Sequence, residues 1–221
     1  MRKKRSYQRD SGQLPLRDYT LFAIACEGSK TEPNYFRSMQ GLSSRISIDI
    51  IEQIVSEEEA LSINANKSAP NWVLDRAVRY IEKEGLGKED QLWFVIDTDR
   101  WNEDQLRTIA NYCEKYPNWH VALSNPCFEV WLYLHKKSSM NLSGNVSCKR
   151  LKREIGSFDK GGYQAELYIP FLPEAIAHAK ELDKHPDYFL PEKLSTKVYQ
   201  LAEALLKTIG EKRFAFLVKQ A

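Results

Sequence analysis

The feature that most constrains the fold of this chain is an alternation of short apolar segments with amphipathic ones between about residues 19 and 135. Three segments are largely apolar, and they cover residues 19–26 (YTLFAIAC), 92–96 (LWFVI) and 119–123 (WHVAL). A fourth, residues 46–51 (ISIDII), alternates at first and is then wholly apolar. Short, continuous apolar runs of this kind are typical of strands buried on both faces. Strands that alternate with helices through short connections predict a parallel, doubly wound sheet with right-handed crossovers.

Amphipathic segments fill the connections between these strands. A helix is expected to begin near Thr31 or Glu32, with Pro33 in its first turn. Residues 70–84 have one apolar stripe and end before Gly85 and Gly87, and a further stripe covers residues 106–113. The last helix of this region is predicted to start at residues 124–126, with an Asn N-cap, a Pro at the first helical position and an apolar stripe of Phe128, Trp131, Leu132 and His135.

The C-terminal third of the chain has a different texture. Residues 136–147 are polar and are expected to form a loop, residues 148–155 a short basic helix, and residues 173–184 and 196–209 two amphipathic helices. We find no internal repeat. The sequence therefore predicts a basic, disordered tail over residues 1–17, an α/β core with four parallel strands over residues 18–135, and a mainly helical extension over residues 136–221 that packs on the core.

Composition excludes several classes of protein. A chain of 221 residues with 43% hydrophobic residues can bury one substantial core, and its net charge of +2 names no partner. No apolar run approaches the roughly 18–20 residues that a membrane span needs, and the N-terminal basic residues precede no apolar signal segment. The four cysteines form no CxxC pair, so we expect reduced core thiols in a cytoplasmic protein, not disulfides or zinc ligands.

Three acidic residues come directly after predicted strands: Glu27 follows the first, and Asp97 and Asp99 follow the third. In open α/β sheets, ligands bind at the carboxyl ends of the strands. Two residues that are two apart point to the same side of extended backbone, and carboxylate oxygens are the ligands that Mg²⁺ prefers. A DxD after a strand also serves turns, helix caps and sugar- or phosphate-transfer enzymes. The order Glu-Gly, one strand, then strand and DxD is more restrictive.

These blocks resemble a known family. A strand followed by Glu27-Gly28 and a later strand followed by Asp97-x-Asp99 is similar to the Toprim domain of topoisomerases, primases and overcoming-lysogenization-defect nucleases. More narrowly, residues 26–36 (CEGSKTEPNYF), 94–99 (FVIDTD) and 124–135 (SNPCFEVWLYLH) resemble the signature blocks of the RloB-like family, bacterial proteins associated with phage resistance and restriction loci. The resemblance covers residues 18–135 strongly and extends weakly to residues 194–198 (LSTKV).

The resemblance implies a function and its cofactor. It implies a Toprim-like fold and an Mg²⁺- or Mn²⁺-dependent nuclease that cleaves phosphodiester bonds of DNA or RNA as an effector of anti-phage defence, with a co-encoded ATPase as partner. The resemblance also implies that Asp97 and Asp99 are metal ligands and that Glu27 is a ligand or a general acid/base. The alternative is a catalytically silent module of the same fold that binds nucleic acid or a partner. A DxD transferase is a third reading, in which the Glu-Gly block has no role.

Two further residues can be read in two ways. Glu129 lies in the first turn of the helix that follows the fourth strand, where it either complements the helix dipole or, as nuclease-type Toprim proteins imply, is a ligand of a second metal or an orienting base. Lys30 lies in a loop that opens a helix, where it either binds a substrate phosphate or is simply solvated. Thr31 and Glu32 are expected to be helix caps.

The remaining charged and polar candidates concern nucleic acid and packing. Arg100 is expected to pair with a neighbouring aspartate or to touch substrate, and His135 is expected to be a buried core histidine. Basic runs are usually solvated, but here they also predict contacts with a nucleic-acid backbone, and they contain Arg2, Lys3, Lys4, Arg5, Lys149, Arg150, Lys152 and Arg153. No zinc motif, nucleophile elbow or Walker A sequence is present.

Overall fold

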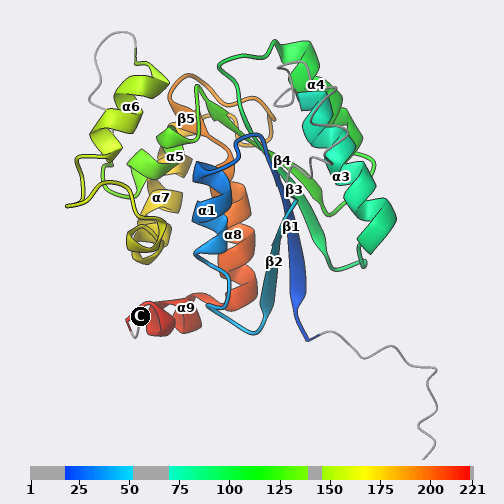
Figure 1. Cartoon of the computed structure of the whole chain (residues 1–221), viewed down its shortest axis with the longest axis horizontal. Coiled ribbons are helices and arrows are strands. Elements are labelled where there is room, and N and C mark those ends of the chain that lie inside the picture. Colours follow the sequence, from blue (N-terminus) through cyan, green and yellow to red (C-terminus); the bar gives the residue numbers. More distant parts are fainter. Residues whose placement is uncertain (1–17, 52–69, 139–145, 220–221) are drawn as a thin grey trace, which may run out of the picture.

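The computed structural model describes residues 18–51, 70–138 and 146–219, and their centre is a mixed five-stranded sheet (Figure 1). The strands are β1 (Thr20–Cys26), β2 (Ile46–Ile50), β3 (Gln91–Asp97), β4 (Trp119–Asn125) and the two-residue β5 (Ser195–Thr196). Their order across the sheet is β2-β1-β3-β4-β5. The first four strands are parallel, as the apolar runs predict, and β5 is antiparallel to β4.

The strand order reverses between β1 and β3. The chain leaves β1 through α1 (Thr31–Arg37) toward β2, whereas it leaves β3 through α4 (Glu103–Cys113) toward β4 on the other side. Helix α1 packs on one face of the sheet and α4 on the opposite face, so the two connections diverge (Figure 1). This divergence opens a crevice at the carboxyl ends of β1 and β3, the place where open α/β sheets bind ligands.

Alternate side chains of the buried strands fill two cores. On one face, Phe22, Ile24 and Val95 pack with α1 and with α8 (Val198–Ile209). On the other face, Ala23, Ala25 and Phe94 pack with α3 (Pro70–Glu84) and α4. A strand that supplies apolar residues to both faces must be apolar throughout, which is why the runs that form β1 and β3 show no polar alternation, whereas the edge strand β2 does.

The C-terminal region is helical and adds one strand. Its helices are α6 (Cys148–Ile155), α7 (Leu172–Leu182), α8 and α9 (Glu211–Leu217), with short 3₁₀ turns at Ala165–Leu167 and Ile169–Phe171. The prediction of four strands is therefore incomplete: residues 195 and 196 extend the sheet as β5 before α8 begins. A two-residue strand has no hydrophobic period, so nothing in the sequence distinguishes it from the start of the helix. Helix α9 was also not predicted.

Helix α5 (Glu129–Leu134) begins later than the sequence predicts. Asn125 is the last residue of β4 and not an N-cap, the Asn125–Pro126 peptide bond is cis, and Phe128 occupies the N-cap position without a side-chain cap. The carbonyl of Pro126 instead accepts hydrogen bonds from the backbone N–H groups of Thr98 and Asp99, each at 3.1 Å. The Asn-Pro dipeptide thus shapes the loop that follows β4 rather than the start of α5.

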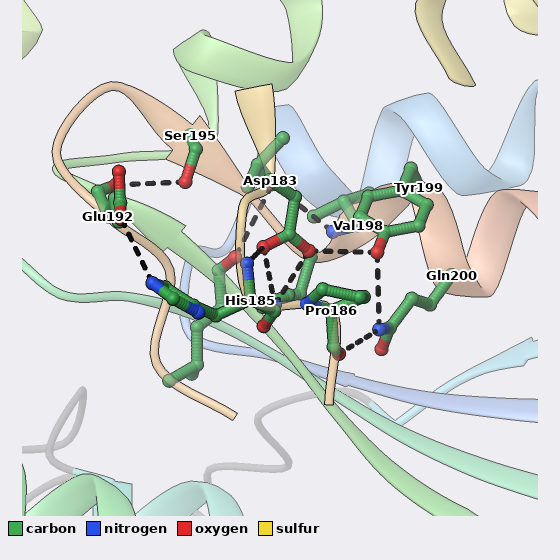
Figure 2. Close-up of polar contacts among 11 residues, drawn as sticks. Asp183, His185, Pro186, Glu192, Ser195, Val198, Tyr199 and Gln200 are labelled. Carbon is green, nitrogen blue, oxygen red and sulfur yellow. Dashed lines mark hydrogen bonds and ion pairs between the residues drawn. The ribbon is translucent and has the colours of Figure 1, made fainter. Parts of the chain in front are cut away.

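The segment 194–198 is part of a buried polar network (Figure 2). The Lys197 ammonium is 1% exposed and lies 2.8 and 2.6 Å from the two carboxylate oxygens of Asp183. It also donates to the carbonyl of His185 at 2.6 Å, and the Tyr199 hydroxyl donates to Asp183 at 2.8 Å. This network fixes the end of α7 to the start of α8, so the block that resembles the family here is structural.

The cysteines differ in part from the prediction. Cys26 and Cys113 are free and buried, as expected, but Cys127 and Cys148 form a disulfide that joins the β4–α5 connection to the start of α6. The expectation of four reduced thiols is wrong for this pair, because a separation of 21 residues with no CxxC spacing gives no sign of proximity. Among the described residues, no helix is long and apolar enough to span a membrane.

Candidate metal centre and its acidic pocket

An acidic pocket of about 330 Å³ opens at the crevice between the ends of β1 and β3. The three acidic residues predicted from the strand ends line it, and so does Glu129. A fifth carboxylate, that of Glu32, was expected only to cap a helix. The basic residues along its wall are Lys30, Arg100 and Lys152. We refer to Glu27, Glu32, Asp97, Asp99 and Glu129 as the acidic cluster.

Glu27 and Asp97 are joined across neighbouring strands. Oε2 of Glu27 accepts a hydrogen bond from the backbone N–H of Asp97 at 3.0 Å, and Oε1 accepts one from the indole N–H of Trp101 at 3.1 Å. Oδ1 of Asp97 accepts the backbone N–H of Phe128 at 2.8 Å. These contacts connect the ends of β1 and β3 to the start of α5, through backbone N–H groups of Asp97 and Phe128 and the side chain of Trp101.

Burial raises the pKa of both carboxyl groups. Desolvation raises the pKa of Glu27 to about 7, although the two hydrogen bonds that its carboxylate accepts act to lower it. Asp97 has its pKa raised to about 9, first by desolvation and then by the negative charges of Glu32, Glu27 and Glu129. Carboxylates that raise one another's pKa in a buried pocket attract either protons or a cation.

Glu32 is the site residue that the sequence reasoning missed. Its side chain is 7% exposed, and its pKa is raised by burial and then by the charge of Glu129, while backbone N–H groups lower it. The Glu32 carboxylate lies directly against Gly28, where a Cβ atom would collide with Oε2 and the Glu32 side chain would have to shift. The sequence does hold a sign of this position. Glu32, like Glu129, lies in the first turn of a helix that follows a strand, a position from which a carboxylate can reach the ends of the strands.

Glu129 faces the pocket from α5. Its side chain is 5% exposed and Oε1 lies 3.4 Å from the ammonium group of Lys152 on α6. Lys152 was predicted to track a nucleic-acid backbone, and the structure places it at the wall of the acidic pocket. Lys30 also lines the pocket but is exposed, so both readings of this lysine stay open.

The other predicted residues lie at or beyond the rim. Arg100 pairs with Asp99, with Nε 4.0 Å from Oδ1, as one of its two readings expects. Lys149, Arg150 and Arg153 are exposed on α6, where Arg150 pairs with Glu154 at 3.2 Å. Arg2, Lys3, Lys4 and Arg5 lie outside the described residues. His135 is buried as expected, with its ring nitrogens 2.9 Å from the Tyr35 hydroxyl oxygen and 3.0 Å from the Trp131 carbonyl oxygen.

The chemistry of these carboxylates fits a hard divalent cation. Carboxylate oxygens are the preferred ligands of Mg²⁺ and Mn²⁺, and each oxygen has two acceptor positions, so Asp97 and Glu27 retain capacity. Within the described parts of the chain, however, no three acidic, histidine or cysteine side chains converge as a ready-made metal site. Metal binding would therefore draw on carboxylates from separate elements, such as Asp99 and Glu129, with water and substrate oxygens as further ligands.

Comparison with known proteins supports the resemblance seen in the three sequence blocks. The family model described as RloB-like protein matches residues 22–205. The chain belongs to the RloB-like family. The matched region includes every member of the acidic cluster and also the Lys197 network, so the RloB-like match spans both the α/β sheet and most of the C-terminal helices. No curated protein and no solved structure matches the chain.

Proposed function

We propose that this RloB-like protein is a Toprim-type, Mg²⁺-dependent nuclease that hydrolyses phosphodiester bonds of DNA or RNA. The observation that carries the proposal is the gathering of five carboxylates, from β1, β3, α1 and α5, at the switch point of the sheet. Five carboxylates would repel a substrate phosphate, and a bound divalent metal would remove that repulsion. When bound, the metal polarises the phosphodiester and activates water.

Some residues of the site would hold the metal, and another would transfer protons. Asp97 and Asp99 would hold the metal, with Glu129 and Glu32 as further candidates on the opposite wall. Glu27, fixed by Trp101 and by the backbone of Asp97, is placed to take a proton from the attacking water or to give one to the leaving oxygen. Water then forms the new P–O bond, the bond to the departing sugar oxygen breaks, and that oxygen receives a proton.

Lys152 is the strongest candidate for a cation that binds the substrate phosphate. Its ammonium group already contacts the buried Glu129 carboxylate at the pocket wall, although the Lys152 side chain is 64% exposed and Lys30, in the loop before α1, is exposed as well. An ammonium group beside a metal site neutralises charge that develops on the phosphoryl oxygens. We therefore place Lys152 in the site and keep Lys30 as a second phosphate contact.

A cleavage assay tests the proposal. The purified protein, alone and with any co-encoded ATPase, is incubated with plasmid, single-stranded DNA and tRNA in Mg²⁺ or Mn²⁺. We expect metal-dependent cleavage that falls at least 100-fold in Asp97→Ala and Glu27→Ala, as for loss of major charge-stabilising groups. Glu89→Ala is the matched control, because Glu89 is exposed and precedes the N-terminal end of β3, the opposite end of the strand from Asp97.

The second candidate function is a catalytically silent binding module of a defence complex. It is favoured by the absence, among the described residues, of three converging ligands and by the protein donors that engage Glu27 and Asp97. Binding of nucleic acid without cleavage under every condition, unchanged by Asp97→Ala, would support it and exclude the nuclease. The proposed role as an anti-phage effector predicts that a plasmid-borne copy with its ATPase partner protects cells from phage, and that Asp97→Ala abolishes protection.

A further inference from the structure

A second pocket lies around the edge strand β2. Its walls come from the end of α1, from β2 and from α3. Helices α1 and α3 pack on opposite faces of the sheet (Figure 1). Its volume is about 420 Å³, within the roughly 300–1,000 Å³ typical of ligand sites. We call it the β2-edge groove, and its charged lining residues are Arg37, Arg76, Arg79, Lys83, Asp49 and Glu84.

The balance of charge in this groove is positive. Four cationic side chains and two acidic ones line it, so the net charge of the lining is +2 even though Lys83 is itself the partner of Glu84. The Tyr80 hydroxyl donates to the Asp49 carboxylate at 2.7 Å, and Glu84 lies 2.9 Å from the Lys83 ammonium. The floor is apolar, made by Ile48, Ile50 and Ile51. A positive groove with an apolar floor matches a phosphate backbone with its sugars and bases.

Arg76 connects the groove to the acidic pocket. Its Nη2 donates to the carbonyl of Cys26 at 2.7 Å, and Cys26 is the residue directly before Glu27. The guanidinium is partly buried, and its Nε has no hydrogen-bond partner among the described residues. The positive groove therefore starts within one residue of the acidic cluster, on the side of the sheet edge.

We propose that the β2-edge groove binds the backbone of the nucleic-acid strand whose phosphodiester enters the acidic pocket. The phosphates next to the reacting one contact Arg76, Arg79 and Lys83, and so set the path of the strand across the edge of the sheet. This site differs from the basic runs of the N-terminal tail and of α6. That the groove binds nucleic acid rests on the proposed function. Binding in the groove does not require that the nucleic acid is cleaved.

The test is binding of a labelled single-stranded oligonucleotide, measured by fluorescence anisotropy with the full chain in EDTA between 50 and 300 mM salt. In EDTA no cleavage occurs, so binding is measured alone. Arg79→Ala/Lys83→Ala should weaken binding by about 10- to 30-fold at 0.1 M salt and reduce the salt slope by about 1.4, the loss of two contacts to a single strand. The single variant Lys83→Glu, at a side chain 76% exposed, should weaken binding without any effect on folding.

The matched control is Lys212→Ala/Arg213→Ala, which removes the same charge from exposed positions on α9. It should leave the affinity and salt slope near those of the wild type. Two results would overturn the proposal that the β2-edge groove binds nucleic acid. One is equal weakening in both double variants, and the other is no weakening in Arg79→Ala/Lys83→Ala and Lys83→Glu. The outcome is separable from the nuclease proposal: groove-dependent binding without metal-dependent cleavage supports the groove and refutes the nuclease.

Discussion

At the scale of single residues, the neighbouring carboxylates of the acidic cluster repel one another and destabilise the folded state when they are ionised. Asp97 is half-buried near Glu27, Glu32 and Glu129, and its raised pKa means that folding disfavours its ionised form. Such a group makes the folded state less stable as pH rises from the unfolded pKa toward the folded one. Functional sites commonly carry this kind of stability cost.

Asp97→Asn tests this cost. Asparagine keeps the oxygen that accepts the N–H of Phe128 but never ionises. Wild-type Asp97 has a folded pKa of about 9 against a usual value of 3.8, so its penalty grows between about pH 4 and 9. In EDTA, we expect the Tm of Asp97→Asn to exceed that of the wild type by roughly 5 °C or more at pH 8, and the difference to shrink toward pH 4. A pH-independent difference would contradict the assignment.

Individual residues also show where sequence reasoning worked and where it stopped. Glu27, Asp97 and Asp99 were predicted from their positions after apolar strands, because the carboxyl ends of parallel strands share one edge of the sheet. Glu32 was assigned to a helix cap, since the sequence does not say on which side of α1 its first turn lies. Lys152 lies on a separate helix, and only the docking of α6 brings it to Glu129.

At the scale of elements, two buried polar contacts hold helices in place. The Tyr35 hydroxyl on α1 and the His135 ring next to α5 meet at 2.9 Å, which ties together the helices that carry Glu32 and Glu129. The Lys197–Asp183 pair ties α7 to α8. Each contact predicts a distinct effect on stability.

His135 should make the protein sensitive to acid. Burial lowers its pKa to about 3 from the usual 6.5, so the unfolded chain takes up a proton first as pH falls. The stability of the neutral, buried form is complete above pH 6.5 and is lost progressively down to about pH 3, with about 2 kcal/mol lost at pH 5. Chemical unfolding of His135→Phe should show a smaller loss of stability between pH 7 and 5 than the wild type. Equal losses in the two proteins would show that His135 does not titrate as described.

Lys197 should be much harder to replace alone than together with Asp183. Lys197→Met leaves a buried, unpaired carboxylate, and we expect a loss of about 3–5 kcal/mol in the free energy of unfolding. Lys197→Met/Asp183→Leu removes both charges and should recover most of that loss, measured by urea unfolding. If the double variant is as unstable as the single one, the pair is not the source of the effect.

At the scale of the whole molecule, the alternating pattern predicted the parallel strands β1 to β4 and most of the helices. It did not predict the strand order, because hydrophobic periodicity carries no information on which strands are neighbours. The switch point between β1 and β3, the antiparallel β5 and the Cys127–Cys148 link all arise from contacts between residues distant in the sequence. The β2-edge groove likewise depends on α1 and α3 meeting around one strand.

The central claim is that the acidic cluster at this switch point binds a divalent metal, and titration of Mn²⁺ by calorimetry at pH 8 tests it most directly. The wild type should bind Mn²⁺, and Asp97→Ala/Asp99→Ala should lose that binding. Glu89→Ala/Asp187→Ala, which removes two exposed carboxylates elsewhere, should bind as the wild type does. Equal Mn²⁺ binding by the wild type and Asp97→Ala/Asp99→Ala, or none by the wild type, would contradict the account.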